Sequence, residues 1–325
     1  MGHFTAHRLV VEAEVTTPLE LNEHKGSALR GALYHALLNR FCTMRDGAQE
    51  CARCPIWQVC PVCTLVSTLA PGNRLGPDAA RPYTVQPPLD ESRLSYAPGE
   101  RLTFGLTLYA DAMRLFPYLV MALYGLEEEG LGRRATANGW RRGTVHIVAI
   151  RAENPLTGES AVVARAGEAM VQVPDIPITH PQVLARAEAL RAVSEVTLDL
   201  LTPARLTHRG ALVRPGRLTL AIVLARLFDR LESLTQHFSD KPLDLPYREL
   251  LEQAEGAEVV RDETRWVELR SYSTRQRRAT PIGGLVGRVT LAFENWAAIL
   301  PWLLWGQYTH VGKDAVKGNG WYIIT

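Results

Sequence analysis

Lysine, net charge and long apolar runs are all scarce in this sequence. Only four of its 36 basic residues are lysines, Lys25, Lys241, Lys313 and Lys317, and the formal net charge is +2. So small a net charge excludes nucleic-acid binding through bulk positive charge and leaves local clusters of arginine to provide it. Arginine pairs with phosphates and stacks on bases through its planar guanidinium, although a GC-rich genome is the more common cause of such a bias.

No apolar run approaches the roughly 18 residues that a membrane-spanning helix needs, and residues 1–15 alternate like a strand instead of forming a secretory leader. We therefore expect a soluble, cytoplasmic protein without membrane contact. In a cytosolic chain, five cysteines favour metal binding or redox use over a disulfide framework.

The length of 325 residues and the hydrophobic content of 46% suit two domains, each with its own core. In the first half, alternating apolar residues predict strands at 3–16, 101–109 and 144–151 and an edge strand within 81–98. Helices are predicted at 27–41 and 112–128. The resulting order, β-α-β-β-α-β, is that of a ferredoxin-like unit.

The second half repeats this cycle. Strands are predicted at about 194–201, 258–272, 285–293 and 321–324, and helices at about 218–238 and 296–305. The second of these helices is almost wholly apolar and is expected in the core. We therefore predict an α+β fold of tandem ferredoxin-like (RRM-like) domains, at 1–173 and 182–325, joined by a linker at 174–181.

A cysteine-rich insert at about 42–80 follows the first helix and holds Cys42, Cys51, Cys54, Cys60 and Cys63. Two C-x2-C pairs so close together can surround one ion, and a tetrahedral site needs four of the five thiols. The fourth ligand beside Cys51, Cys54 and Cys60 is either Cys42 or Cys63. Zinc is the favoured ion and a 4Fe–4S cluster the alternative; free thiols are the remaining interpretation. Four thiolates leave no open position for a substrate, so the expected role is structural.

In the helix predicted at 27–41, with Ser27 as its N-cap, the apolar residues share one face: Leu29, Ala32, Leu33, Ala36 and Leu37. Tyr34 and His35 fall on the other face, outside the expected core. Gly31 lies one turn before His35 and allows another chain or a ligand to approach the helix there.

Glycine is concentrated near the end of the sequence, in Ile282-Gly-Gly-Leu-Val-Gly287 and in a glycine-rich loop at 312–320. Glycines let backbone N–H groups converge on an anion, and two lysines add charge. The order of these residues is not that of a nucleotide P-loop, so the predicted anion is a nucleic-acid phosphate. A strand-closing turn would need glycine as well. The loop residues concerned are Gly312, Lys313, Lys317, Gly318 and Gly320.

Arginine clusters at 270–278, beside the stackable Tyr272 at a strand end, and phosphate binding is its expected role. The cluster consists of Arg270, Arg275, Arg277 and Arg278. A weaker patch surrounds Trp140 and consists of Arg133, Arg134, Arg141 and Arg142.

The segments SYSTRQRRATPIGGLVGRVTLAF and THVGKDAVKGNGWYI resemble the C-terminal motifs of the CRISPR-associated endoribonucleases that cut precursor CRISPR RNA within its repeats, a family of the RAMP superfamily. The resemblance continues through LDLLTPARLTHRGALV and SALRGALYHALLNRF, so it spans both halves. It implies two ferredoxin-like domains and metal-independent cleavage by attack of a 2′-hydroxyl, which leaves 2′,3′-cyclic phosphate and 5′-OH ends.

Such cleavage needs a base for the 2′-hydroxyl, an acid for the leaving oxygen, and cations near the phosphorus. The resemblance implies a histidine in or beside the first helix, here His35 or His24, with Tyr34 acting beside it. Lys25 and Lys313 are candidate cations. His310 competes because it precedes the glycine-rich loop. Some relatives take their histidine from the loop after this helix, where this sequence has none.

The expected function is therefore processing of precursor CRISPR RNA, with repeat RNA, the processed crRNA and other CRISPR effector subunits as partners. An alternative from another class is a non-catalytic crRNA-binding subunit of an effector complex. A third interpretation makes the cysteine-rich insert the functional part, as a redox-responsive or protein-docking module.

Overall fold

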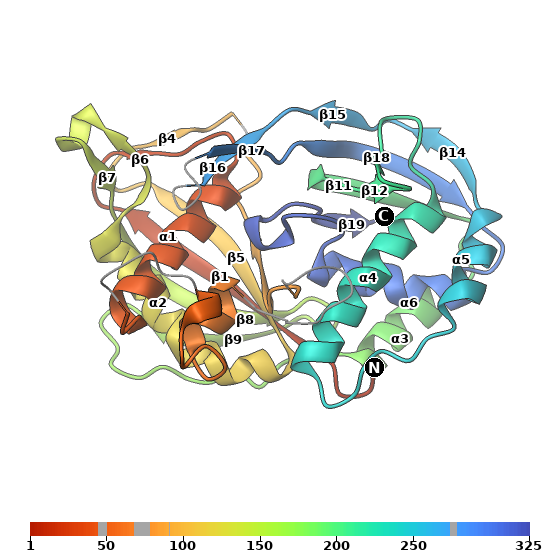
Figure 1. Cartoon of the computed structure of the whole chain (residues 1–325), viewed down its shortest axis with the longest axis horizontal. Helices are drawn as coiled ribbons and strands as arrows, with labels where there is room; N and C mark the ends of the chain where they lie inside the picture. The colour runs from red at the N-terminus through yellow and green to blue at the C-terminus, as the bar shows by residue number, and fades with distance from the viewer. Residues whose placement is uncertain (45–50, 68–78, 91, 274–277) are drawn as a thin grey trace. The chain divides into compact units, whose positions relative to one another are not determined.

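The computed structural model describes residues 1–44, 51–67, 79–90, 92–273 and 278–325 (Figure 1). Its contacts divide the chain into two compact units. The N-terminal unit comprises Ala6–Pro177 with His237–Ser239, and the C-terminal unit comprises Met1–Thr5, Ile178–Gln236 and Asp240–Thr325. The main division falls at Pro177, inside the segment predicted as a linker. Within the described residues, no helix is long and apolar enough to cross a membrane.

The N-terminal unit is built on an antiparallel sheet with the strand order β3-β5-β1-β8-β9. The four predicted strands are, in chain order, β1, β3, β5 and β8. In the sheet they lie in the order β3-β5-β1-β8, with β1 and β5 in the middle, as in a ferredoxin-like unit. Leu9, Val11 and Ala13 of β1 are completely buried, as the alternation predicted. The strands are β1 (Thr5–Val15), β3 (Tyr83–Gln86), β5 (Arg101–Tyr109), β8 (Val145–Asn154) and β9 (Glu159–Arg165).

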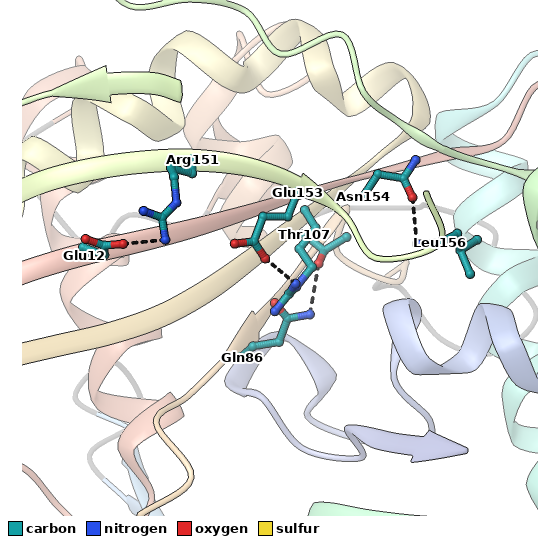
Figure 2. Close-up of polar contacts among 8 residues, drawn as sticks. Glu12, Gln86, Thr107, Arg151, Glu153, Asn154 and Leu156 are labelled. Carbon is teal, nitrogen blue, oxygen red and sulfur yellow. Dashed lines mark hydrogen bonds and ion pairs between the residues drawn. The ribbon is translucent and has the colours of Figure 1, made fainter. Parts of the chain in front are cut away.

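Polar side chains reinforce the register of this sheet, as Figure 2 shows. Arg151 of β8 forms an ion pair with Glu12 of β1 at 2.6 Å. Gln86 of the edge strand donates a hydrogen bond to the Thr107 hydroxyl of β5 at 3.2 Å. Both contacts join neighbouring strands, and the partly exposed ion pair contributes no more than about 1 kcal/mol.

Helix α1 (Lys25–Phe41) buries the apolar face that the sequence predicts: Leu29, Ala32, Leu33, Ala36 and Leu37. Its N-cap is His24, whose Nδ1 accepts the backbone N–H of Ser27 at 3.1 Å, so the prediction of Ser27 as the cap is wrong. The helix packs against α2 (Phe116–Glu129). The contact is close, since a Cβ added to Gly125 would lie 2.9 Å from that of Ala36.

The C-terminal unit repeats the architecture with the strand order β14-β18-β11-β19, again second, third, first, fourth. The prediction of tandem ferredoxin-like domains is therefore confirmed. The cycle consists of β11 (Glu195–Ala204), α4 (Leu220–Phe238), β14 (Glu258–Asp262), β18 (Gly284–Ala292), α6 (Trp296–Thr309) and β19 (Tyr322–Ile324), with β15 (Arg265–Val267) also paired to β18.

Helix α6 lies in the core of its unit, as its composition predicted. Trp296 and Trp305 are almost completely buried, and Trp305 donates a hydrogen bond from Nε1 to Nδ1 of His180 at 3.1 Å. His180 begins α3 (His180–Ala189), whose first turn carries a capping box of Thr179 and Gln182. Neither α3 nor α5 (Tyr247–Glu255) was among the predicted helices.

Short elements complete both units. The hairpins and short pairs are β2 (Leu19–Glu20) with β4 (Ser95–Tyr96), β6 (Leu131–Ala135) with β7 (Arg141–Gly143), β12 (Thr207–His208) with β13 (Ala211–Leu212), and β16 (Arg270–Ser273) with β17 (Arg278–Pro281). Strand β10 (Ile178–Thr179) and the short helical turns η1 (Cys51–Arg53), η2 (Cys63–Ser67), η3 (Ala110–Leu115), η4 (Thr136–Asn138) and η5 (Ala315–Lys317) are the remaining elements described.

Candidate functional site

Tyr34 and His35 lie side by side on the face of α1 that is turned away from the core. Both are half-buried, and their ring centroids are 5.3 Å apart in an edge-on arrangement. The guanidinium of Arg30, one turn earlier, lies 5.1 Å from the centre of the Tyr34 ring. One helix therefore presents a histidine, a tyrosine and an arginine together at the surface of the N-terminal unit.

The surroundings of His35 favour its neutral imidazole. Partial burial lowers the pKa of His35 below 6.5, and the positive charges of Arg142 and Arg30 lower it further, while Glu129 opposes them. Within the described part of the chain, the His35 ring makes no hydrogen bond, so its nitrogens are not committed to a structural partner. At neutral pH such a histidine is able to accept a proton.

The other candidates near this helix have structural roles. His24 is 8% exposed and caps α1, whereas His35 lies 11 residues further on, about 16 Å along the helix axis. Lys25 is 3% exposed, and its ammonium donates to the Asp90 carbonyl and lies 6.0 Å from the centre of the Tyr96 ring. The structure therefore does not bring His24 and Lys25 to His35.

The glycine-rich loop uses its backbone for contacts within the C-terminal unit. The N–H groups of Gly318 and Gly320 donate to the carbonyls of Ala315 and Pro203, at 2.9 and 3.1 Å. A Cβ at Gly320 would lie 1.9 Å from the carbonyl oxygen of Val311, and one at Gly312 would lie 2.7 Å from that of Arg205. Glycine is needed at these positions because the backbones pack closely. The N–H groups of Gly318 and Gly320 already bind carbonyls of the same unit, so they do not form the predicted cradle for a phosphate.

The two lysines of the loop differ. Lys317 forms an ion pair with Asp314 at 2.8 Å, which offsets its charge. Lys313 is exposed and has no ion-pair partner within the ranges that the structure describes. Of the two, Lys313 is the one whose charge is available to an anion.

His310 is completely buried, in contrast to the expectation that it meets a substrate. Its ring stacks on Trp321 with an interplanar angle of 9°, and Nδ1 lies 3.2 Å from the carbonyl oxygen of Asn319. Burial and the positive charge of Arg230 lower the pKa of His310 to about 3. A neutral, buried ring at the C-cap of α6 has a structural role, because an RNA cannot contact it without local unfolding.

The arginine cluster of the C-terminal unit is only partly described. Arg270 is exposed on β16. Arg275, Arg277 and the side chain of Arg278 lie outside the described residues, so phosphate binding by this cluster stays a prediction.

Two of the cysteines in the insert, Cys51 and Cys60, lie beside Cys63. Its thiol makes hydrogen-bonding contacts with the thiols of Cys51 and Cys60, and burial together with these contacts raises the pKa of Cys63. Cys42, at the C-cap of α1, has its thiol 3.9 Å from the carbonyl oxygen of Met44 instead. All five cysteines are free, and across the described ranges no three His, Cys, Asp or Glu side chains form a ready-made metal site.

Arg142 is a site residue whose place the sequence did not predict. It belongs to the arginine patch around Trp140, yet its charge acts on His35, which is more than 100 residues earlier. No local signal in the sequence connects two residues so far apart; only the fold brings β7 to α1.

The chain is built of two ferredoxin-like domains in tandem, with a histidine and a tyrosine on the face of the first helix that is turned away from the core. Residues 4–176 match the AF_1859_N family model, an N-terminal domain, and residues 198–322 match the model of the CRISPR-associated endoribonuclease Cas6. The C-terminal part of the chain, residues 198–322, is therefore similar to the Cas6 family.

Solved structures share this fold over the whole chain. A partial Cas6-RT-Cas1–Cas2 complex is 15% identical with a TM-score of 0.62 over 100% of this chain, which spans 46% of that longer one. Thermus thermophilus Cas6 is 15% identical with a TM-score of 0.55, covering 99% of each chain. A Cas6 product complex is 17% identical with the same TM-score. No curated protein matches the sequence significantly.

Proposed function

We propose that this protein is an endoribonuclease that cuts precursor CRISPR RNA within its repeats. The observation that carries the proposal is the pairing of Tyr34 with His35 on the exposed face of α1, where the pKa of His35 is lowered. The match of residues 198–322 to the Cas6 family model and the fold shared with a Cas6 product complex support it.

In the proposed mechanism, neutral His35 takes the proton of a 2′-hydroxyl, and the oxygen attacks the neighbouring phosphorus. The bond to the 5′-oxygen breaks as the cyclic phosphate forms, and this oxygen takes a proton from the Tyr34 hydroxyl or from water. Arg142, whose charge already acts on His35, is the nearby cation assigned to the negative phosphorane. Lys313 and Arg270, exposed on the C-terminal unit, are assigned to RNA phosphates, and no metal takes part in the reaction.

The first test is cleavage of the host's own CRISPR repeat RNA by the purified protein in excess EDTA. We expect one cut within the repeat and products that end in a 2′,3′-cyclic phosphate and a 5′-hydroxyl, identified by mass spectrometry. Binding of the repeat RNA without any cut would instead identify a non-catalytic crRNA-binding subunit. Cutting that stops in EDTA and returns with Mg²⁺ would contradict the metal-independent mechanism.

Repeat RNA and the processed crRNA are the proposed partners. One solved relative is a Cas6-RT-Cas1–Cas2 complex. We extend this to the proposal that the present chain also works beside other CRISPR proteins.

We further propose that Cys51, Cys54, Cys60 and Cys63 hold one structural ion, zinc in preference to a 4Fe–4S cluster. The convergence of the Cys51, Cys60 and Cys63 thiols supports this set of four, since Cys42 contacts Met44 instead. Such an ion would cross-link the insert through residues 51–63.

Replacing Cys54 by alanine is expected to lower the melting temperature by about 5 °C or more and to remove the metal, because a tetrahedral ion loses one of its ligands. The cut position in the repeat should not change. Metal content and colour identify the ion: a colourless protein with one zinc, or a brown one that absorbs near 400 nm, about the region expected of a cysteine-ligated cluster.

Cys42→Ala is the matched control and should keep both the metal and the melting temperature. Loss of the ion in Cys42→Ala would assign the fourth ligand to Cys42. A protein that contains no metal and melts normally after either replacement would identify free thiols.

A further inference from the structure

The β6–β7 hairpin carries a large aromatic side chain at its tip. Trp140 is 67% exposed, whereas Trp296 and Trp305 of α6 are almost completely buried. Figure 1 labels the hairpin β6 and β7, and its tip, drawn in yellow, projects away from α1. An indole that gives so much of its surface to water contributes little to the core of its own unit.

The backbone at this tip is strained. Gly139 and Trp140 follow each other with φ values of +60° and +62°, and the Trp140 N–H donates to the Ala135 carbonyl at 3.0 Å. A left-handed conformation suits glycine, but for a bulky residue it costs on the order of 1–2 kcal/mol. The fold tolerates that cost at an exposed position, where a glycine would close the same turn without it. Strain of this kind is a recurrent mark of functional positions.

The hairpin is held tightly against β2 and the preceding Pro18, both in its strands and at its tip. The side-chain amide of Asn138 donates to the Pro18 carbonyl, and a Cβ at Gly143 would lie 2.6 Å from the same oxygen. A Cβ at Gly132 would lie 2.1 Å from the Glu20 carbonyl oxygen. Because both strands fit against β2 without space for a larger residue, the tip is presented in a fixed orientation.

Positive charge surrounds the exposed indole. Three of the four arginines in the hairpin are exposed and Arg142 is half-buried, and Arg134 stands directly opposite Arg142 in the register of the two strands. Like charges in this position destabilise a hairpin. None of the four has an ion-pair partner in the part of the chain that is described. The four are Arg133, Arg134, Arg141 and Arg142.

The hairpin also adjoins the candidate catalytic residue. The charge of Arg142 is the second largest cause of the lowered pKa of His35, after burial. A polyanion whose cleavable phosphate lies at His35 would therefore pass close to β7.

We propose that the β6–β7 hairpin is a clamp for single-stranded RNA beside the cut. One base stacks on Trp140, and the phosphates that flank it contact the arginines of the two strands. Stacking suits an unpaired base, because only an unpaired base exposes its face to a side chain. The assignment deepens the proposed function and rests on it, and it identifies the hairpin as the part of the protein that selects unpaired nucleotides next to the cleavage position.

Replacing Trp140 by glycine separates a ligand-binding role from a structural one. The melting temperature should stay the same or rise, because glycine relieves the strained φ. The affinity for the host's repeat RNA, made uncleavable by a 2′-deoxy sugar at the cut, should fall about 5- to 150-fold, the range for loss of one stacked base. Trp140→Phe keeps an aromatic face and should retain most of the affinity. Fluorescence anisotropy and a thermal melt give both quantities.

The arginines are tested through salt dependence. Arg133→Ala together with Arg134→Ala should flatten the plot of log Kd against log salt by about 0.7 units for each RNA phosphate that the variant no longer binds. The control is Arg191→Ala, which removes an exposed arginine that is already paired with Glu188 at 2.7 Å and should leave the slope unchanged.

The outcomes distinguish this assignment from the proposed function. The clamp alone would be overturned if the wild-type protein binds and cuts the repeat but neither variant differs from it. In that case Trp140→Gly would have the wild-type affinity, and the double arginine variant would have the wild-type salt slope. A lower melting temperature in Trp140→Gly with unchanged affinity would show a structural indole and overturn it as well. Wild-type protein that binds no repeat RNA would overturn the proposed function, and the clamp with it.

Discussion

Replacing His35 by alanine is expected to lower the single-turnover cleavage rate by about 100-fold or more, the usual contribution of a positioned base. Affinity for uncleavable repeat RNA should change by less than about twofold, because the half-buried imidazole is assigned to the proton and not to a phosphate. The ring makes no hydrogen bond within the described residues, so its loss should leave the melting temperature nearly unchanged. Rapid quench with enzyme in excess measures the rate of the chemical step.

The controls use the other two candidate histidines. His310→Ala opens a cavity beside Trp321 and should lower the stability of the protein, but the fraction that is folded should cut at the normal rate. His24→Ala removes the cap of α1 and should cost about 1 kcal/mol of stability, with the same result for cleavage. If His310→Ala abolishes cleavage in folded protein and His35→Ala does not, the reaction belongs to the glycine-rich loop.

The pH profile of the same reaction reports the protonation of His35. The base must be neutral, and its pKa is lowered, so the rate should be full at neutral pH and fall only below pH 6.5, as the imidazole gains its proton. Arg142→Gln removes one of the charges that lower this pKa and should move the acid limb toward higher pH. A purely structural role for His35 would leave the position of that limb unchanged in the variant.

The fold was accessible from the sequence because its elements are periodic. The burial of Leu29, Leu33 and Leu37 in α1 follows from helical spacing, and the repeated order of strands and helices predicted both sheets. The β6–β7 hairpin escaped prediction because its strands are rich in arginine and glycine and show no alternation of apolar residues. Helices α3 and α5 are short, and each has only two buried residues, so their periodic signal is weak.

The candidate site was only partly accessible. A histidine off the apolar face of a helix can be predicted from spacing, as His35 was. His310 is covered by Trp321, which stacks on it from the far end of the loop, and its pKa is lowered further by the charge of Arg230 on another helix. The glycines at 312 and 320 were an ambiguous signal. Glycine is needed both where a backbone approaches a phosphate and where it approaches another backbone, and the structure shows the second case.

A repeat RNA with a single 2′-deoxy sugar at the cut is expected to remain intact under conditions in which the all-ribose RNA is cut completely. The proposed reaction has no nucleophile other than that hydroxyl, so its removal should abolish the chemical step instead of slowing it. Binding should stay nearly the same, because one hydroxyl contributes little to an interface dominated by phosphates and stacked bases. A gel assay with labelled RNA measures cleavage, and competition against the all-ribose RNA measures affinity.

The matched control moves the deoxy sugar one nucleotide to either side, where cleavage should continue at the normal rate because the attacking hydroxyl is restored. Cutting of the original deoxy substrate at the same position would require water or another nucleophile to attack the phosphorus. His35 would then have no 2′-hydroxyl to deprotonate, and the products would end in a simple phosphate. The end groups therefore decide between the two reactions even if some of the deoxy substrate is cut.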